Sequence, residues 1–185
     1  MLARQVRQLK AVCRPVAVIG PDPDPQGIDV PIQADRLPGH GPLGGILTAL
    51  EETRSEFNLI VACDLPFLDT QFLKRLAREA VLFGADVTVP EDKSHRWHPL
   101  CGVYRRGLRG IIRTRIVHGA NKADGYFRRV RLRVMKWSEI VGAGFSSHIF
   151  DNINRPAEFE EAKRRLEAIS GAVASGGSIQ ESRMP

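Results

Sequence analysis

The sequence has few cysteines and lacks an apolar run long enough to cross a membrane. Its three cysteines, Cys13, Cys63 and Cys101, are odd in number, far apart and without a CxxC pair. This pattern argues against a disulfide framework and a cysteine-based zinc site, so we expect three small core residues in a reducing, cytoplasmic compartment. No stretch approaches the roughly 18 apolar residues of a membrane span, so no membrane partner is predicted.

Aromatic residues are also scarce, at 6% of the chain. The segment 105–136 carries eleven Lys and Arg against one acid, Asp124, in a chain of net charge +6. Only Tyr104, Tyr126 and Phe127 offer stacking surfaces there, and no RNA- or DNA-binding signature is present. We therefore expect no nucleic acid, and two interpretations stay open: a solvated basic face, or a surface for an anionic small molecule.

What the sequence does contain is an alternation of apolar strands and amphipathic helices. At 185 residues and 43% hydrophobic, the chain suits one globular domain over 1–169, followed by a small, polar and disordered tail over 170–185. The patterns predict strands at 16–19, 28–32, 59–63, 85–90, 97–104 and 130–134, and helices at 2–13, 43–50, 71–83, 107–117 and 156–169. This order predicts an α/β domain with a mostly parallel sheet.

The central stretch is Asn58 to Pro66, in which the apolar run Leu59 to Cys63 ends at Asp64. A short run that is apolar on both alternating faces is typical of a parallel strand buried between two helical layers. Ligands bind beyond the carboxyl ends of such strands, so Asp64 is a candidate to hold a metal or a phosphate-bound magnesium ion. The alternative is that Asp64 only caps a turn.

A second candidate is the glycine-rich loop Arg36 to Gly45, which follows Asp35 and feeds a helix. Glycines before a helix let a ligand approach backbone N–H groups at the positive end of the helix dipole, which suits a phosphate or a polar base edge. Structural Gly-Pro turns are common, so the loop alone decides nothing.

Four blocks then occur in order: Gly41–Ile46, Ala62–Leu68, His98–Tyr104 and Asn152–Glu158. In order and spacing they resemble the molybdenum cofactor guanylyltransferases. The resemblance implies a doubly wound, Rossmann-like nucleotidyltransferase fold with helices on both faces. It also implies transfer of GMP from GTP to the terminal phosphate of molybdopterin, giving molybdopterin guanine dinucleotide and pyrophosphate. Further partners would be molybdenum cofactor biosynthesis proteins or a molybdoenzyme.

The resemblance also assigns site residues and a cofactor, Mg²⁺. Asp64 resembles the catalytic, magnesium-binding and nucleotide-contacting Asp of the family, and Asp35 its upstream nucleotide-contacting Asp. The remaining assignments are the segment facing the guanine, Gly41, Pro42, Leu43, Gly44 and Gly45, and the polar pair near the pterin, Asn152 and Asn154.

The chain departs from the family pattern in three places. The family opens with a strand, a Leu-Ala-Gly-Gly loop and a basic segment around the triphosphate, whereas this chain begins at the helix that follows. That first strand would be central, so we expect two internal strands with unpaired edges. Gly20-Pro21 and Arg155 stand where members carry Asn and Thr. We expect the isolated chain to transfer GMP poorly or not at all.

Three hypotheses follow from these departures. The chain is part of a longer guanylyltransferase with the loop restored, or it is a catalytically incomplete relative that binds nucleotide or pterin. The third is a basic adaptor whose segment 105–136 docks an acidic protein. Cytidylyltransferases for the same cofactor share these blocks, so GTP and CTP both remain open.

Overall fold

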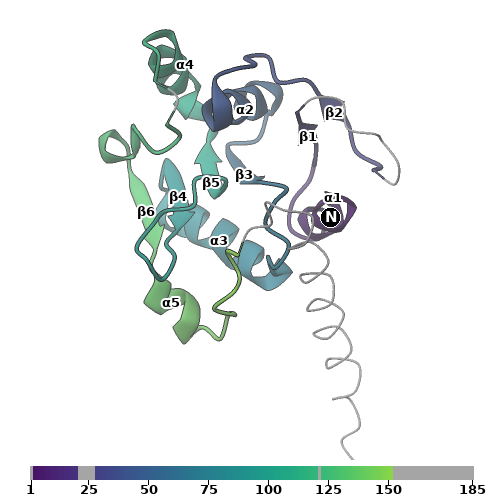
Figure 1. The fold of residues 1–185 in the computed structure, drawn as a ribbon, viewed down its shortest axis with the longest axis vertical. Coiled ribbons are helices and arrows are strands. Elements are labelled where there is room, and N and C mark those ends of the chain that lie inside the picture. The colour runs from purple at the N-terminus through teal and green to yellow at the C-terminus, as the bar shows by residue number, and fades with distance from the viewer. Residues whose placement is uncertain (1, 21–27, 121, 152–185) are drawn as a thin grey trace, which may run out of the picture.

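A computed structural model describes residues 2–20, 28–120 and 122–151 of the chain (Figure 1). The predicted alternation of strands and helices is present in these ranges. The elements in chain order are α1 Leu2–Lys10, β1 Val18–Ile19, β2 Ile32–Gln33, α2 Gly41–Glu52, β3 Phe57–Val61, α3 Thr70–Phe83, β4 Val87–Pro90, β5 Cys101–Arg105, η1 Arg106–Leu108, α4 Arg109–Val117, η2 Phe127–Arg129, β6 Leu132–Met135 and α5 Trp137–Gly142.

The strands form two separate groups. A four-stranded sheet has the order β3-β5-β4-β6, and β1 pairs in parallel with β2 in a sheet of their own. Within the larger sheet β4 and β6 are parallel, whereas β5 runs antiparallel to both β3 and β4. The strands β3, β4 and β6 therefore share one direction and β5 is the reversed strand, which agrees with the predicted α/β class.

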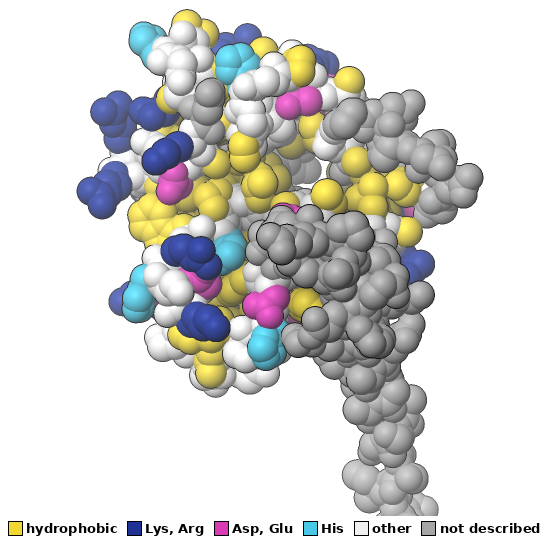
Figure 2. All heavy atoms as spheres, viewed as in Figure 1, with side chains coloured by type: hydrophobic (Ala, Val, Ile, Leu, Met, Phe, Trp, Pro, Cys, Tyr) yellow, Lys and Arg dark blue, Asp and Glu magenta, His cyan; other side chains and the backbone are white. Residues whose placement is uncertain are grey.

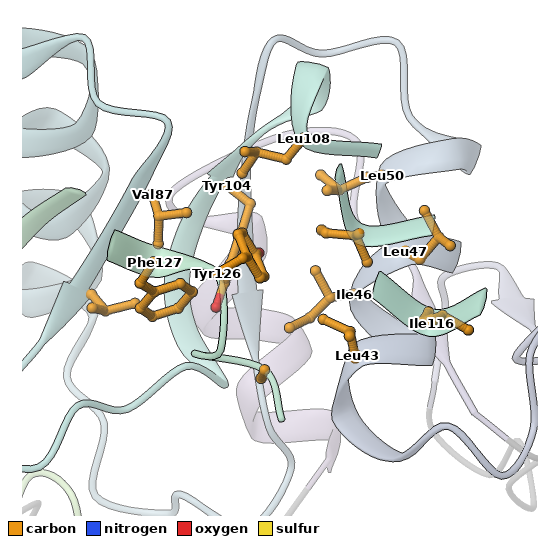
Figure 3. Close-up of a cluster of buried hydrophobic side chains, with 13 residues drawn as sticks. Leu43, Ile46, Leu47, Leu50, Val87, Tyr104, Leu108, Ile116, Tyr126 and Phe127 are labelled. Atoms are coloured by element: carbon orange, nitrogen blue, oxygen red, sulfur yellow. The ribbon is translucent and has the colours of Figure 1, made fainter. Parts of the chain in front are cut away.

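Helices pack on both faces of the larger sheet, as in a doubly wound fold. On one face, Leu43, Ile46 and Leu50 of α2 pack with Tyr104 of β5 and Ile116 of α4 (Figure 3). On the other face, a second cluster buries apolar side chains of α3, β5, β6 and α5, among them Phe72, Leu73, Leu76, Met135 and Ile140. Apolar periodicity in each helix thus places one stripe of side chains against the sheet.

Strand β3 is less buried than its apolar sequence predicts. All five of its residues are partly exposed, whereas every residue of β4 is buried. The reason is its position: β3 is the edge strand of the larger sheet, and within the described ranges it pairs with β5 alone. Within the described ranges no ladder joins β1 to β3, so the edges that we expected to be unpaired would be those of these two strands.

Three predictions need correction or lie outside the described residues. Of the cysteines, only Cys101 is a core residue, because Cys13 is half-buried and Cys63 is exposed in the turn after β3. The glycine-rich segment is shorter as a loop than expected, since α2 begins at Gly41. The predicted helix 156–169 and the tail 170–185 lie outside the described ranges. Within those ranges, no helix is long and apolar enough to cross a membrane.

Candidate functional site

Asp64 lies, half-buried, in the turn that follows the carboxyl end of β3. The turn is fixed from two sides. The Ala62 N–H donates to the Leu100 carbonyl at 2.7 Å, and the Gln5 side chain of α1 donates to the carbonyls of Ala62 and Leu65 at 2.8 and 3.2 Å. Because these bonds hold the backbone on either side of it, the Asp64 carboxylate sits on a preorganised turn.

Asp35 is held against α2. Its Oδ1 accepts hydrogen bonds from the Leu37 N–H at 3.0 Å and from the Thr48 hydroxyl at 2.9 Å. The same hydroxyl accepts from the Arg36 N–H at 3.1 Å. Asp35 therefore holds the loop that precedes α2 against the helix.

The first turn of α2 is built from glycine and proline. Gly41 has φ +55°, a conformation that favours glycine, and Pro42 stands in the first turn of the helix, where no N–H is required. A Cβ on Gly44 would lie 2.7 Å from the Leu37 carbonyl oxygen and 3.2 Å from Asp35 Oδ2. Gly44 thus allows the Asp35 loop to approach the helix closely.

Replacing Gly44 by alanine is expected to destabilise the protein by about 1–2 kcal/mol and to displace the Asp35 loop, because the added methyl group meets backbone. The matched control is Gly45→Ala on the next residue of α2, where a Cβ meets nothing within 4 Å. That change is expected to be neutral or to stabilise by up to about 1 kcal/mol. Chemical denaturation of both variants tests this, and equal destabilisation by the two changes would contradict it.

Asp92 and His98 form a polar pair. His98 Nε2 lies 3.3 Å from Asp92 Oδ2, and the His98 ring stacks on Phe150 with centroids 4.5 Å apart. Asp92 is only 6% exposed, and it also accepts hydrogen bonds from the backbone of Ser94 and from Arg96. His98 stands in one of the four sequence blocks. The sequence analysis did not single out Asp92 as a site residue. An Asp two residues before a Ser in a polar hairpin does indicate a side chain that accepts a hydrogen bond from the backbone of its own turn.

Burial lowers the pKa of the His98 imidazole below its ordinary value of 6.5, and the charge of Arg96 acts in the same direction. The hydrogen bond and charge of Asp92, together with the charge of Asp64, act the opposite way but do not cancel the effect of burial. At neutral pH the ring is therefore uncharged, and its Nε2–H donates to Asp92.

The lowered pKa makes His98 a source of acid sensitivity. As the pH falls below 6.5, the unfolded chain takes up a proton on His98 before the folded protein does, so the free energy of unfolding should decrease. His98→Gln should flatten this part of the profile. Urea unfolding of both proteins between pH 7.5 and 5 measures it. Asp92, whose lowered pKa acts below 3.8, does not interfere in that window. Identical slopes for the two proteins would contradict the prediction.

The structure brings two of the predicted site residues, both from α2, to the lining of one hollow. Pro42 and Gly45 of α2 line it together with Gly20 after β1 and Cys63, the neighbour of Asp64. The carboxyl end of β3 and the first turn of α2 therefore meet there. Asn152 and Asn154 lie outside the described residues, so their assignment to the pterin side stays a prediction.

Two arginines of the basic segment 105–136, Arg105 and Arg106, lie away from Asp64. In the antiparallel register of β3 and β5, Val61 pairs with Cys101 and Phe57 pairs with Arg105. Arg105 and the following Arg106 are therefore at the opposite end of β3 from Asp64. Arg105 is also engaged in ion pairs, 2.8 Å from Glu56 and 3.5 Å from Asp86.

Figure 2 shows Lys and Arg side chains with acidic side chains and His among them on the face in view. Arg113 pairs with Glu51, Arg131 with Asp86, and Arg133 with Glu79 and Glu139. These ion pairs favour the solvated-face interpretation over a dedicated anion site.

A metal ion at Asp64 would have few ligands from the protein itself. Across residues 2–20, 28–120 and 122–151, no group of three or more His, Cys, Asp or Glu is arranged as a metal cage. Mg²⁺ is commonly held by one or two carboxylates, with water and substrate phosphates completing its shell. The half-buried, preorganised carboxylate of Asp64 fits a metal of that kind, with the nucleotide as the other ligand.

Sequence comparisons show the family of this chain. Residues 1–134 match the family described as "MobA-like NTP transferase domain". A probable molybdenum cofactor guanylyltransferase of Carboxydothermus hydrogenoformans is 31% identical over 134 residues, covering 72% of this chain and 66% of the relative. A molybdenum cofactor guanylyltransferase of Shewanella amazonensis is 27% identical over 126 residues, 68% of this chain and 61% of that protein. The chain thus spans about two thirds of the length of these relatives.

Two solved structures share the fold. A putative protein from Aquifex aeolicus superposes with a TM-score of 0.70 at 21% identity, covering 83% of this chain and 78% of its own. Molybdopterin-guanine dinucleotide biosynthesis protein A from Archaeoglobus fulgidus gives 0.69 at 20% identity, with 82% and 78% covered. At these identities the structures establish the architecture only. The family match over most of the chain, together with the relative at 31% identity, shows that this protein belongs to the MobA-like NTP transferases.

Proposed function

We propose that this chain acts in the transfer of GMP from GTP to the terminal phosphate of molybdopterin, which yields molybdopterin guanine dinucleotide and pyrophosphate. The observation that carries the proposal is the position of Asp64. Its carboxylate follows the carboxyl end of β3, and its neighbour Cys63 lines a hollow that the first turn of α2 also lines. Open α/β sheets bind ligands beyond the carboxyl ends of their strands, and the two relatives are named as molybdenum cofactor guanylyltransferases.

The reaction asks for alignment and charge neutralisation more than for covalent chemistry. An oxygen of the molybdopterin phosphate forms a bond to the α-phosphorus of GTP, and the bond from that phosphorus to the bridging oxygen breaks, so that pyrophosphate leaves. Asp64 would hold Mg²⁺, which when bound neutralises triphosphate charge. The fixed turn around Asp64 limits the movement of this carboxylate, which favours a single geometry of attack and departure.

The nucleotide would lie with its base toward α2. Backbone N–H groups of the first turn of α2 carry the positive end of the helix dipole, and the two glycines Gly44 and Gly45 present no side chain there. Asp35, whose Oδ2 lies close to Gly44, would face the same ligand.

The proposal is tested by mixing the protein with Mg²⁺, molybdopterin and either GTP or CTP, and following pyrophosphate release and the mass of the pterin product. We expect a guanine dinucleotide product with GTP and less than one tenth of that rate with CTP. A faster reaction with CTP would assign a cytidylyltransferase. Absence of any product and of Mg²⁺-dependent binding of either nucleotide would overturn the proposal.

A second candidate function is binding of nucleotide without transfer, and the interrupted sheet favours it. The site lies at the end of a hollow between β1 and β3, where no ladder joins the two strands within the described ranges. Because the two strands that flank the hollow belong to separate sheets, they would hold the groups around the α-phosphorus of GTP less firmly than one continuous sheet would. Mg²⁺-dependent stabilisation by GTP with no measurable pyrophosphate release is the result expected of a binding protein.

A further inference from the structure

Gln5 is a polar residue on the buried side of α1. The residues of α1 that line the hollow are Leu2, Gln5, Val6 and Leu9, which have the spacing of one helix face. Gln5 is only 4% exposed, about as buried as its apolar neighbour Val6 at 3%. A buried carboxamide costs free energy unless it is hydrogen-bonded, so the partners of Gln5 explain why an amide is tolerated at this position.

The partners of Gln5 lie at the two ends of the turn that carries Asp64. Its Nε2 donates to the Ala62 carbonyl at 2.8 Å and to the Leu65 carbonyl at 3.2 Å. A carboxamide nitrogen carries two hydrogens, so one bond to each carbonyl uses both of them. Ala62 and Leu65 are the first and last residues of the four-residue segment in which Asp64 is the third. One side chain therefore spans the whole turn.

The turn is not closed by a hydrogen bond of its own. A four-residue turn is often closed by a bond from the N–H of its last residue to the carbonyl of its first. Within the described ranges, no backbone bond joins the Leu65 N–H to the Ala62 carbonyl. The Ala62 N–H donates to the Leu100 carbonyl at 2.7 Å, which fixes only the end of the turn next to β3. Gln5 thus takes the place of the closing bond, because it holds both carbonyls from outside the turn.

A second glutamine of α1 binds the same loop farther from Asp64. Gln8 Nε2 donates to the Leu68 carbonyl at 2.6 Å. Gln8 and Gln5 are therefore the same residue type, on the same helix, with the same kind of bond to a loop carbonyl. They differ in where they bind, since the bonds of Gln5 flank Asp64 and the bond of Gln8 lies beyond the turn.

We propose that Gln5 is a positioning residue for the Asp64 carboxylate, and that its two hydrogen bonds raise the affinity of this site for a divalent metal bound with nucleotide. The inference rests on the proposed function, in which Asp64 holds Mg²⁺. Loss of Gln5 releases the Ala62 and Leu65 carbonyls, so the turn samples more backbone conformations and the carboxylate is less often in place for the metal. Groups that orient metal ligands typically contribute about 10–100-fold to the affinity for the metal.

The test compares Gln5→Met with Gln8→Met in the 185-residue chain. Methionine is a flexible side chain of similar length that lacks the N–H donors of glutamine. Binding of Mn²⁺ in the presence of GTP, followed by electron paramagnetic resonance, should weaken at least about tenfold in Gln5→Met and less than about twofold in Gln8→Met. NMR order parameters of the nucleotide-free proteins give a second readout, in which residues 62–65 become more mobile in Gln5→Met only.

A purely structural role of Gln5 predicts a different pattern, because lower stability does not change the metal affinity of the folded protein. Equal weakening of Mn²⁺ binding in the two variants, or unchanged binding in Gln5→Met, would overturn the proposal. Residues 62–65 that stay as rigid in Gln5→Met as in the parent would overturn it as well. If Gln5→Met does not fold, Gln5→Asn replaces it, since its amide is held one methylene farther from the two carbonyls.

The two readouts separate this proposal from the proposed function. A parent protein that binds no Mn²⁺ with GTP would contradict the proposed function. The order parameters need neither metal nor nucleotide, so the positioning role of Gln5 would then stand or fall on the mobility of residues 62–65 in Gln5→Met compared with Gln8→Met.

Discussion

Replacing Asp64 by asparagine is expected to lower nucleotidyl transfer at least about a thousandfold and to remove the magnesium-dependent part of GTP binding. A thousandfold loss corresponds to about 4 kcal/mol, which is of the size expected when a carboxylate that anchors the metal is lost. Asparagine keeps the shape of the side chain, so the fixed turn between Ala62 and Leu65 should fold as before. Pyrophosphate release and titration calorimetry with GTP, with and without Mg²⁺, measure the two effects.

Asp69→Ala on the same loop is the matched control. Asp69 caps α3, since its Oδ1 accepts from the N–H groups of Gln71 and Phe72 at 2.6 and 3.1 Å. Its loss should cost about 1 kcal/mol of stability and leave GTP binding unchanged. A structural readout separates the pair further: Asp64→Asn removes a charge that raises the pKa of His98, so that pKa should fall in this variant alone. If Asp64→Asn still bound GTP in a Mg²⁺-dependent way, this result would contradict the assignment of Asp64 as the residue that holds the metal.

Replacing Gly102 by alanine should give the largest loss of stability, about 2–3 kcal/mol. Gly102 is in the middle of β5, and a Cβ there would lie 2.9 Å from Val89 Cγ1, 3.0 Å from the Thr88 carbonyl oxygen and 3.2 Å from Tyr104 Cε2. The carbonyl belongs to the neighbouring strand β4, so the ladder itself must shift to make room. Overpacking of a buried site typically costs 1–3 kcal/mol.

Gly107→Ala serves as the control for Gly102→Ala, because a Cβ at Gly107 meets nothing within 4 Å. It should change the free energy of unfolding by less than about 0.5 kcal/mol. In a chain of this length, the Gly102 variant should melt roughly 5–10 °C lower than the parent protein. A melting temperature of Gly102→Ala within 2 °C of the parent would show that β4 and β5 are not packed as described.

The elements of the fold were predictable where the pattern is local. Helix α3 was expected at 71–83 and spans Thr70–Phe83. The prediction succeeded because the apolar stripe of the helix and its N-cap, Asp69, are local features of one continuous stretch of sequence. Asp64 at the carboxyl end of β3 was predictable for the same reason, since a short apolar run that ends in an acid needs no knowledge of its neighbours.

The remaining features depend on pairing between distant residues. The position of Arg105, opposite Phe57 and remote from Asp64, follows from the antiparallel pairing of β5, which an apolar run does not reveal. Cys63 was expected in the core because its run is apolar, yet the run continues into an exposed turn. The contact of the buried Asp92 with His98 could be recognised only from the structure, which brings the hairpin that carries Asp92 beside the His98 ring.

The most direct test of the proposed site is paramagnetic broadening of backbone NMR signals by Mn²⁺ in the presence of GTP. Mn²⁺ accepts the same carboxylate and phosphate ligands as Mg²⁺, and its broadening falls steeply with distance. We predict the strongest loss of signal at residues 62–65 and in the first turn of α2, with sharp signals at Arg105 and Arg106 at the other end of β3. Broadening centred on Arg105 and Arg106, or the same pattern without GTP, would contradict a nucleotide-metal site at Asp64.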